Sequence, residues 1–257
     1  NWNKGDRGAG IYTNRARNLR VTENLIDHNG WHPAISSRDG ELHKRGLQAH
    51  GCYFSGRYNS GVPDKWDAAD NGEQFLVEFH GNIVTRSSAN GAQFRLGGNV
   101  TDNVFIGQPM AFYTWTNASQ VHRNAILDGT HVDMADEFYQ RGWGLQIIAS
   151  GDYTDNLIAN VSRPAAGSWA VVYEHGGAEV HDNVFYNWRP PGKDGSVWDK
   201  NDTGLPRVTN NTDTIGGDID ATLTDAQIEQ IADRERGVWG DAYDGAVISE
   251  NLRKAYQ

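Results

Sequence analysis

Cysteine is almost absent from the sequence: Cys52 is the single one among 257 residues. One thiol can neither close an intrachain disulfide nor build a cysteine-based zinc site. Proline is also sparse, with 7 residues against 30 glycines, while hydrophobic residues make up 38% of the chain. This composition excludes a disordered tail, a collagen-like chain and a coiled coil, and the length allows one large domain or two ordinary ones.

Basic side chains are outnumbered by acidic ones, with 23 Lys and Arg against 33 Asp and Glu, and the formal net charge is −10. Because there is no global basic field, we do not expect nucleic acid as a partner. No stretch of about 18 apolar residues occurs, so we expect no membrane span. The chain starts at Asn1 without a recognisable signal peptide, which indicates a processed form or a fragment.

A short phrase recurs along the chain: an apolar residue, two mostly polar residues, Asn and then, in most copies, an apolar pair. Its asparagines are Asn24, Asn82, Asn103, Asn124, Asn156, Asn183 and Asn211. By subtraction, the steps from Asn82 onward are 21, 21, 32, 27 and 28 residues, and the first step of 58 fits two coils of about 29 residues. Units of roughly 20–30 residues, made of short β-runs with Gly and Asn at the corners, indicate a β-solenoid.

The repeated Asn has a physical role in such a coil. Asn tolerates left-handed backbone angles, so we expect it at a bend. Its amide can bond to the Asn one coil away, which satisfies a buried polar group without charge. The variable step lengths predict constant strands and loops that grow at one corner.

A second strand precedes the Asn phrase in several coils: Gly46–His50, Gly91–Arg95 and Gly144–Ile148. Because side chains alternate faces along a strand, one set points into the coil and the other outward. We expect an inward set of Leu47, Ala49, Ala92, Phe94, Leu145 and Ile147. We expect an outward polar ladder of Gln48, His50, Gln93, Arg95 and Gln146. Residues 112–115 and 169–175 should continue this strand, the latter with outward Tyr173 and His175.

The pattern changes near the C-terminus. Residues 224–227 resemble a capping box, and apolar residues follow them at helical spacing. A second short helix is expected over residues 244–256. We therefore expect one domain, with a β-solenoid over residues 1–222 and a helical cap over residues 223–257 that covers the open end of the coil.

These features together resemble a known group of proteins. The Asn-marked coils, the strand Gly91–Gly98 and the ending Val238–Val247 with its terminal helix are similar to right-handed parallel β-helix proteins of the pectate-lyase-like superfamily. The resemblance implies an all-β, right-handed parallel β-helix. It also implies a secreted or periplasmic enzyme that acts on an acidic polysaccharide or oligosaccharide, most directly a polysaccharide lyase.

A lyase that cleaves a uronate polymer by β-elimination needs a cation that neutralises the carboxylate, a base and an acid. The planar fork of arginine suits a sugar carboxylate, so we expect Arg95 to bind it. We expect His50, together with Lys44 or Tyr53, to supply the base and the acid. His80, in a following strand, is a further candidate.

Polar side chains of the outward ladder are expected to bind sugar hydroxyls, and aromatic side chains are expected to stack on sugar rings. The candidate substrate-binding residues are Gln48, Gln93, Gln146, Tyr113, Trp115, Tyr173 and His175. This chemistry needs no cofactor, and we expect none.

Other readings remain open beside the lyase. Acidic residues crowd 64–73 and 128–137 and could supply the carboxylate pair of a glycoside hydrolase or phage-type depolymerase. The same clusters could hold Ca²⁺, although no repeating calcium motif occurs. A non-catalytic carbohydrate-binding solenoid is the third function. Missing N-terminal coils, a partner chain or a homo-oligomer could cover the edges of the first coil.

Overall fold

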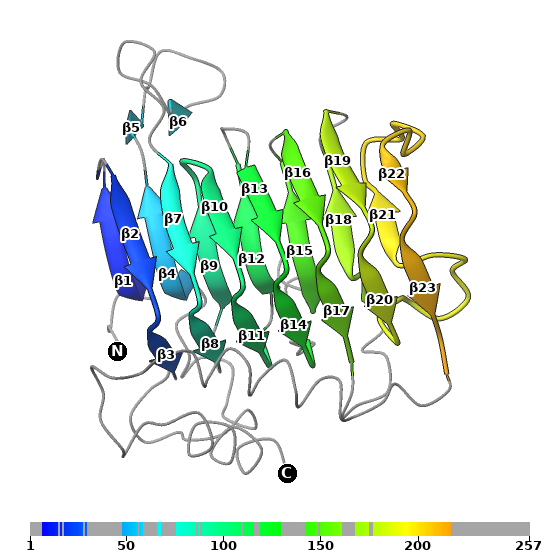
Figure 1. Ribbon diagram of the computed structural model, residues 1–257, viewed down its shortest axis with the longest axis horizontal. Helices are drawn as coiled ribbons and strands as arrows, with labels where there is room; N and C mark the ends of the chain where they lie inside the picture. Colours follow the sequence, from blue (N-terminus) through cyan, green and yellow to red (C-terminus); the bar gives the residue numbers. More distant parts are fainter. Residues whose placement is uncertain are drawn as a thin grey trace.

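The computed structural model describes residues 7–14, 16, 18–27, 29, 48–55, 57–58, 66–67, 76–85, 87, 89–108, 110–115, 119–129, 142–148, 150–160, 168–174 and 177–216. Three parallel sheets of seven strands each run side by side along one axis (Figure 1). The chain visits them in the same order in every coil, so the fold is a parallel β-helix. This confirms the predicted all-β solenoid, and no helix occurs in the part of the chain that the structure describes.

The first sheet, sheet A, holds the longest strands. They are β1 (Arg7–Asn14), β4 (Gln48–Ser55), β9 (Asn90–Phe94), β12 (Met110–Thr114), β15 (Trp143–Ile147), β18 (Val171–Tyr173) and β21 (Val197–Asp199). A separate two-stranded antiparallel pair is formed by β5 (Arg57–Tyr58) and β6 (Trp66–Asp67).

The other two sheets follow sheet A in each coil. Sheet B contains β2 (Leu19–Thr22), β7 (Val77–His80), β10 (Gly98–Thr101), β13 (Ser119–His122), β16 (Gly151–Thr154), β19 (Ala178–His181) and β22 (Val208–Thr209). Sheet C contains β3 (Leu25–Asp27), β8 (Ile83–Thr85), β11 (Val104–Ile106), β14 (Ala125–Leu127), β17 (Leu157–Ala159), β20 (Val184–Tyr186) and β23 (Thr212–Thr214).

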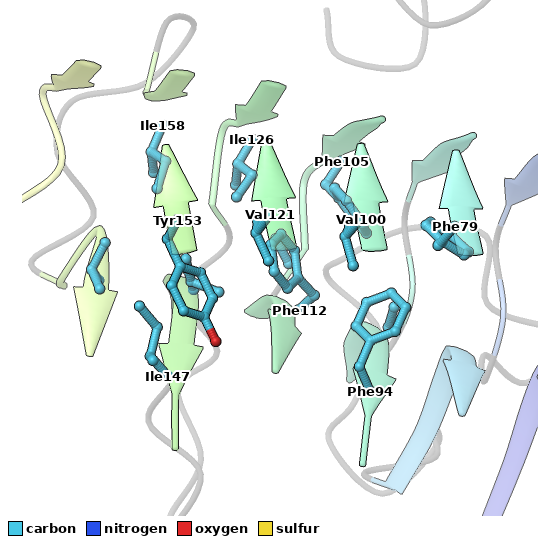
Figure 2. Packing of buried hydrophobic residues seen from close by; sticks show 14 of the residues in the cluster. Phe79, Phe94, Val100, Phe105, Phe112, Val121, Ile126, Ile147, Tyr153 and Ile158 are labelled. Atoms are coloured by element: carbon cyan, nitrogen blue, oxygen red, sulfur yellow. The ribbon is translucent and has the colours of Figure 1, made fainter. Parts of the chain in front are cut away.

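The interior is built from apolar rows that run along the axis, and Figure 2 shows parts of them. Sheet B contributes Val21, Phe79, Val100, Val121, Tyr153 and Val180. Sheet C contributes Ile26, Val84, Phe105, Ile126, Ile158 and Phe185. The rows meet in the middle, where the Phe79 ring of sheet B lies 6.2 Å from Phe105 of sheet C and 5.4 Å from Phe94 of sheet A. Full burial of each such side chain contributes about 1.5–3 kcal/mol.

The inward set predicted for the second strand is confirmed where the structure describes it. Ala92, Phe94, Leu145 and Ile147 on sheet A are all buried in the core. Leu47 and the Ala49 side chain lie outside the described residues.

The repeated asparagines form a ladder inside the corner between sheets B and C. The Asn124 Oδ1 accepts the backbone N–H and the side-chain amide of Asn103, at 3.0 and 2.9 Å. Its own Nδ2 donates to Asn156 Oδ1 and to the Val100 carbonyl, each at 2.9 Å. The same direct bonds connect Asn24, Asn82, Asn103, Asn124, Asn156, Asn183 and Asn211. The predicted amide stack is therefore confirmed.

Two details of the predicted coil are wrong. Asn24 bonds directly to Asn82, so the step of 58 residues is a single coil with insertions and not two coils. The left-handed bend lies one residue before each Asn: Asp102 and Arg123, for example, have φ of 58° and 53°. The Asn itself stays out of the left-handed region because its amide must point along the axis to reach the next coil.

Loop growth occurs at two corners instead of one. The corner between sheets B and C always consists of the left-handed residue and the Asn. Additional chain enters between sheets C and A, at residues 28–47 and 128–142, and between sheets A and B, at residues 56–75 and 200–207. Sheet A is therefore flanked by the variable segments on both sides.

Polar side chains replace two of the core rows in the last coil, while Val197 and Val208 continue other rows. Asp213 continues the row of Phe185, and it accepts hydrogen bonds from Ser196 N and Oγ at 2.7 and 2.8 Å. Asp199 continues the row of Tyr173 and accepts from Gly204 N at 2.7 Å. Carboxylates at these positions end the two rows to which they belong. The helical cap predicted over 223–257 and the boundary at residue 222 lie outside the described residues.

Replacing a central ladder asparagine should destabilise the whole coil. In Asn124→Ala, the buried N–H groups of Asn103 lose their acceptor and the Val100 carbonyl loses a donor. We expect the free energy of unfolding to fall by about 2–5 kcal/mol. Urea unfolding measures this loss. The control is Asn99→Ala on the exposed face of sheet B, for which we expect a change within about 0.5 kcal/mol. Equal effects of the two substitutions would contradict a structural role for the ladder.

Candidate functional site

The outer face of sheet A carries two rows of side chains that run along the axis. We call the first the central row; its positions are Tyr12, Tyr53, Gln93, Tyr113, Gln146, Val172 and Trp198. We call the second the marginal row; its positions are Asn14, Ser55, Arg95, Trp115, Ile148, Glu174 and Lys200. Residues between these positions, such as Phe94 and Ile147, belong to the core. Positions far apart in the chain thus share one wall.

The register of this wall differs from the predicted one. The segment Gly51–Ser55, and not Gly46–His50, aligns with Gly91–Arg95. The alignment pairs Gly51 with Gly91, because neighbouring coils approach too closely there for a side chain. A Cβ at Gly91 would lie 2.5 Å from the Ala111 carbonyl oxygen. The pattern Gly-x-x-Phe, shared by residues 51–54 and 91–94, could have given the correct register from the sequence.

Arg95 lies between two aromatic rings on this wall. Its guanidinium carbon is 4.1 Å from the ring centroid of Trp115 and 5.5 Å from that of Tyr53. Trp115 is the marginal-row neighbour of Arg95 in the next coil, and Tyr53 belongs to the coil before. Cation–π attraction of this kind holds a guanidinium in place. The Nε and Nη1 atoms of Arg95 are buried on this wall.

Tyr53 is the centre of the cluster. The Tyr12 ring stacks on it at 5.6 Å and the His50 ring at 5.5 Å, with interplanar angles of 15° and 13°. Tyr53 is half-buried and Tyr12 is 61% exposed, so the cluster is open to solvent on one side. We call Tyr12, His50, Tyr53, Arg95 and Trp115 the Arg95 cluster.

His50 belongs to this cluster in a different way from the prediction. His50 does not occupy the position that matches Arg95. The strand pairing places it level with Asn90, one residue before Gly51. Its ring is buried, and Nδ1 accepts the backbone N–H of Asn90 at 3.3 Å. The proton of the neutral ring is therefore on Nε2. Even so, the expected convergence of His50, Tyr53 and Arg95 on one outer face is observed.

Gln93 is in the central row, between Tyr53 and Tyr113, and precedes Arg95 of the marginal row by two residues. Its residue is only 7% exposed, and its Oε1 has no hydrogen-bond partner in the described structure. An unsatisfied buried amide oxygen costs about 1–3 kcal/mol, so it is a position where a ligand hydroxyl would gain a bond. Because this oxygen is buried, the role of Gln93 in substrate binding stays a prediction.

A second aromatic group lies further along the same face. Trp143, Trp169 and Trp198 come from three successive coils, and all three are half-buried. The Trp198 ring lies 6.2 Å from each of the other two. We call these residues the tryptophan platform. Trp198 was not among the predicted binding residues, although its place in an alternating Val-Trp-Asp run at residues 197–199 was a usable signal.

Polar side chains adjoin the tryptophan platform. Gln146 Nε2 donates to Glu174 Oε1, and Lys200 Nζ lies 3.0 Å from the same carboxylate oxygen. Gln146 is in the central row, as predicted, but it is only 9% exposed.

Other predicted site residues lie elsewhere. Tyr173 points into the core, where its hydroxyl donates to the Ala178 carbonyl at 2.9 Å, so its predicted outward position is wrong. The shift arises because Val172, and not Tyr173, aligns with Gln146. Lys44, His175 and the side chains of Gln48 and Tyr113 lie outside the described residues.

His80 is on sheet B, which removes it from the Arg95 cluster. It belongs to an alternating row of Thr22, His80, Thr101, His122, Thr154, His181 and Thr209. His80 Nδ1 lies 3.0 Å from Thr101 Oγ1 and 3.5 Å from Asp102 Oδ2. The predicted catalytic role of His80 is not supported by this position.

No group of three or more His, Cys, Asp and Glu side chains arranged to hold a metal ion occurs among the residues that the structure describes. Most of the two acidic clusters lies outside those residues. No helix in that part of the chain is long and apolar enough to cross a membrane.

Comparisons with protein-family models, with characterised proteins and with solved structures found no match to this chain. The fold therefore rests on the strand pairing itself. Any activity must be argued from the chemistry of the outer face of sheet A.

The histidine row on sheet B generates a prediction about pH. His181 Nδ1 lies 2.7 Å from Asp182 and Nε2 lies 2.8 Å from Asp152, and these carboxylates raise the pKa of His181 above 6.5. A raised pKa stabilises the fold fully below pH 6.5, and this contribution is lost as pH rises through the folded-state pKa.

Urea unfolding across this pH window checks the effect. We expect the difference in stability between the parent chain and His181→Gln to shrink as pH rises. The matched control, His122→Gln, replaces a ring that lies 2.9 Å from Gln120 Oε1. A difference for His181→Gln that stays constant with pH would contradict the raised pKa.

Proposed function

We propose that this chain is a polysaccharide lyase that binds an acidic, uronate-containing polysaccharide on the outer face of sheet A and cleaves it by β-elimination. The observation that carries the proposal is the Arg95 cluster, in which the guanidinium lies over the ring of Tyr53 on the outer face of sheet A. The resemblance to right-handed pectate-lyase-like β-helices agrees with this function, and it adds a secreted or periplasmic location to the proposal.

Arg95 supplies the electrostatic part of the reaction. Its positive charge neutralises the uronate carboxylate, and the neutralised carboxylate makes the neighbouring C–H more acidic. Contact with the rings of Trp115 and Tyr53 fixes the direction of the guanidinium before the substrate arrives. Gln93 Oε1, two residues earlier on the same face, accepts a hydroxyl proton of the same sugar.

Tyr53 is the proton carrier in this proposal. As a phenolate it removes the proton next to the carboxylate; the C–H electron pair forms the new double bond, and the bond to the glycosidic oxygen breaks. The phenol then returns the proton to that leaving oxygen, so atoms and charge balance. His50 is buried and its Nδ1 is engaged by Asn90, which favours Tyr53 over His50 for this step. His50 holds the Tyr53 ring by stacking.

A non-catalytic carbohydrate-binding solenoid is the second candidate, and the tryptophan platform favours it, because stacked indoles bind sugars without any chemistry. The hydrolase alternative gains less support. In the described part of the two outer rows, Glu174 is the single carboxylate, and an inverting hydrolase needs two at about 6.5–9.5 Å.

Incubation with a panel of uronate polymers distinguishes these functions. The panel should contain polygalacturonate, alginate, hyaluronan, chondroitin and glucuronoxylan. We expect ultraviolet absorbance from an unsaturated uronate product to rise with at least one polymer. New reducing ends without that absorbance would indicate a hydrolase, and binding without either signal would indicate the non-catalytic solenoid.

Two substitutions test the assigned roles on the polymer that is cleaved. Tyr53→Phe removes the proton carrier and keeps the stacked ring, so we expect kcat to fall at least about 100-fold. Arg95→Gln removes the carboxylate ligand, so we expect kcat/KM to fall by a similar factor. Initial rates of absorbance change measure both.

The matched controls are Tyr186→Phe on sheet C and Arg189→Gln in the loop before β21, which remove the same groups away from the cluster. We expect both controls to keep the parent rate. Full activity in Tyr53→Phe would overturn its role as proton carrier.

A further inference from the structure

The tryptophan platform is a site of unusual composition on the outer face of sheet A. Gly144 N donates to the Trp169 carbonyl, so Trp143 and Trp169 lie level in neighbouring coils. Trp198 reaches both from the next coil, nearly parallel to Trp169 at 22° and tilted to Trp143 at 66°. The three indoles form one surface and not three separate contacts.

This surface is partly accessible, whereas the fold has room to bury indoles. Trp188, in the same coils, is 1% exposed and its Nε1 donates to the Gly142 carbonyl at 2.8 Å. The three platform residues are half-buried instead. Large rings that keep an accessible face on the wall of a solenoid are suited to stack on the apolar face of a sugar ring.

Charge decides which sugar the platform accepts. The carboxylate of Glu174 receives both the Gln146 amide and the Lys200 ammonium. The charges of Glu174 and Lys200 therefore compensate one another, and Lys200 is engaged by its own neighbour. Among the described residues, no cation lies against the platform rings in the way that Arg95 lies against Trp115 in the Arg95 cluster.

The platform and the Arg95 cluster lie on one continuous face. Four strand steps separate β9, which leads into Arg95, from β21, which holds Trp198. At about 4.8 Å per step this is roughly 19 Å, a span that several linked sugar residues cover. One polymer chain that runs along the axis therefore contacts both sites.

We propose that the tryptophan platform is a subsite for a neutral pyranose, so that the substrate is a heteropolysaccharide with both uronate and neutral hexose residues. This inference rests on the proposed function for the uronate part only. Binding of a neutral sugar to the platform requires no turnover, so it is tested separately.

Isothermal titration calorimetry with neutral oligosaccharides provides the test. The probes are hexamers of glucose, galactose, mannose and N-acetylglucosamine. We expect the parent chain to bind at least one of them, and Trp198→Ala to weaken that binding at least about fivefold. Trp198→Phe keeps an aromatic ring and should retain most of the affinity.

Further variants guard against a folding artefact. Trp169→Ala removes a second ring of the platform and should weaken binding to a similar extent. Val184→Ala truncates an exposed apolar side chain on sheet C and should leave binding unchanged. Thermal unfolding of each variant shows whether the coil is intact.

Two results would overturn the platform proposal: no neutral hexamer binds the parent chain, or Trp198→Ala and Trp169→Ala both fold and bind as tightly as the parent. If neutral hexamers bind through Trp198 but no uronate polymer is cleaved, the subsite stands and the lyase function fails. If uronate polymers are cleaved and the tryptophan variants bind normally, the lyase stands and the subsite fails.

Discussion

The hydrogen bonds between stacked asparagine amides are the constraint on which the rest of the structure depends. At the corner between sheets B and C, each Asn satisfies two N–H groups of the coil before it and donates to the coil after it. A slip by one residue would break these bonds and turn an apolar row to the outside. The ladder therefore fixes the register at one corner of every coil, and insertions are confined to the other two corners.

A fixed register has consequences for the outer face of sheet A. The rings of Tyr53 and Trp115 come from different coils, yet both contact the guanidinium of Arg95 because the strands of sheet A pair in a fixed register. The close glycine approach at Gly91 adds to this alignment. The same wall then continues to Trp198. The face thus combines a cation at one end with stacked indoles at the other, and the proposed binding of an acidic heteropolysaccharide rests on this combination.

Much of the fold could be predicted from the repeated Asn alone, since a polar residue that recurs between apolar pairs requires a stack that satisfies it. The coil number failed at Asn24, because a step of 58 residues does not distinguish two coils from one coil with long insertions. The site was predicted in part: Arg95, Tyr53, His50 and Gln93 do share a face. His50 and Tyr173 were misplaced because alternation gives the face of a residue only when the strand start is known. Trp198 was missed since its neighbours in space, Trp143 and Trp169, are distant in sequence.

A crystal structure of the chain with an oligosaccharide that contains both uronate and neutral hexose residues tests the central claim most directly. The account predicts a sugar chain that runs along the axis on the outer face of sheet A, with a carboxylate at Arg95, a hydroxyl at Gln93 Oε1 and a pyranose ring stacked on Trp198. An oligosaccharide bound instead on the Thr and His row of sheet B, or across sheet A without contact to Arg95, would contradict it.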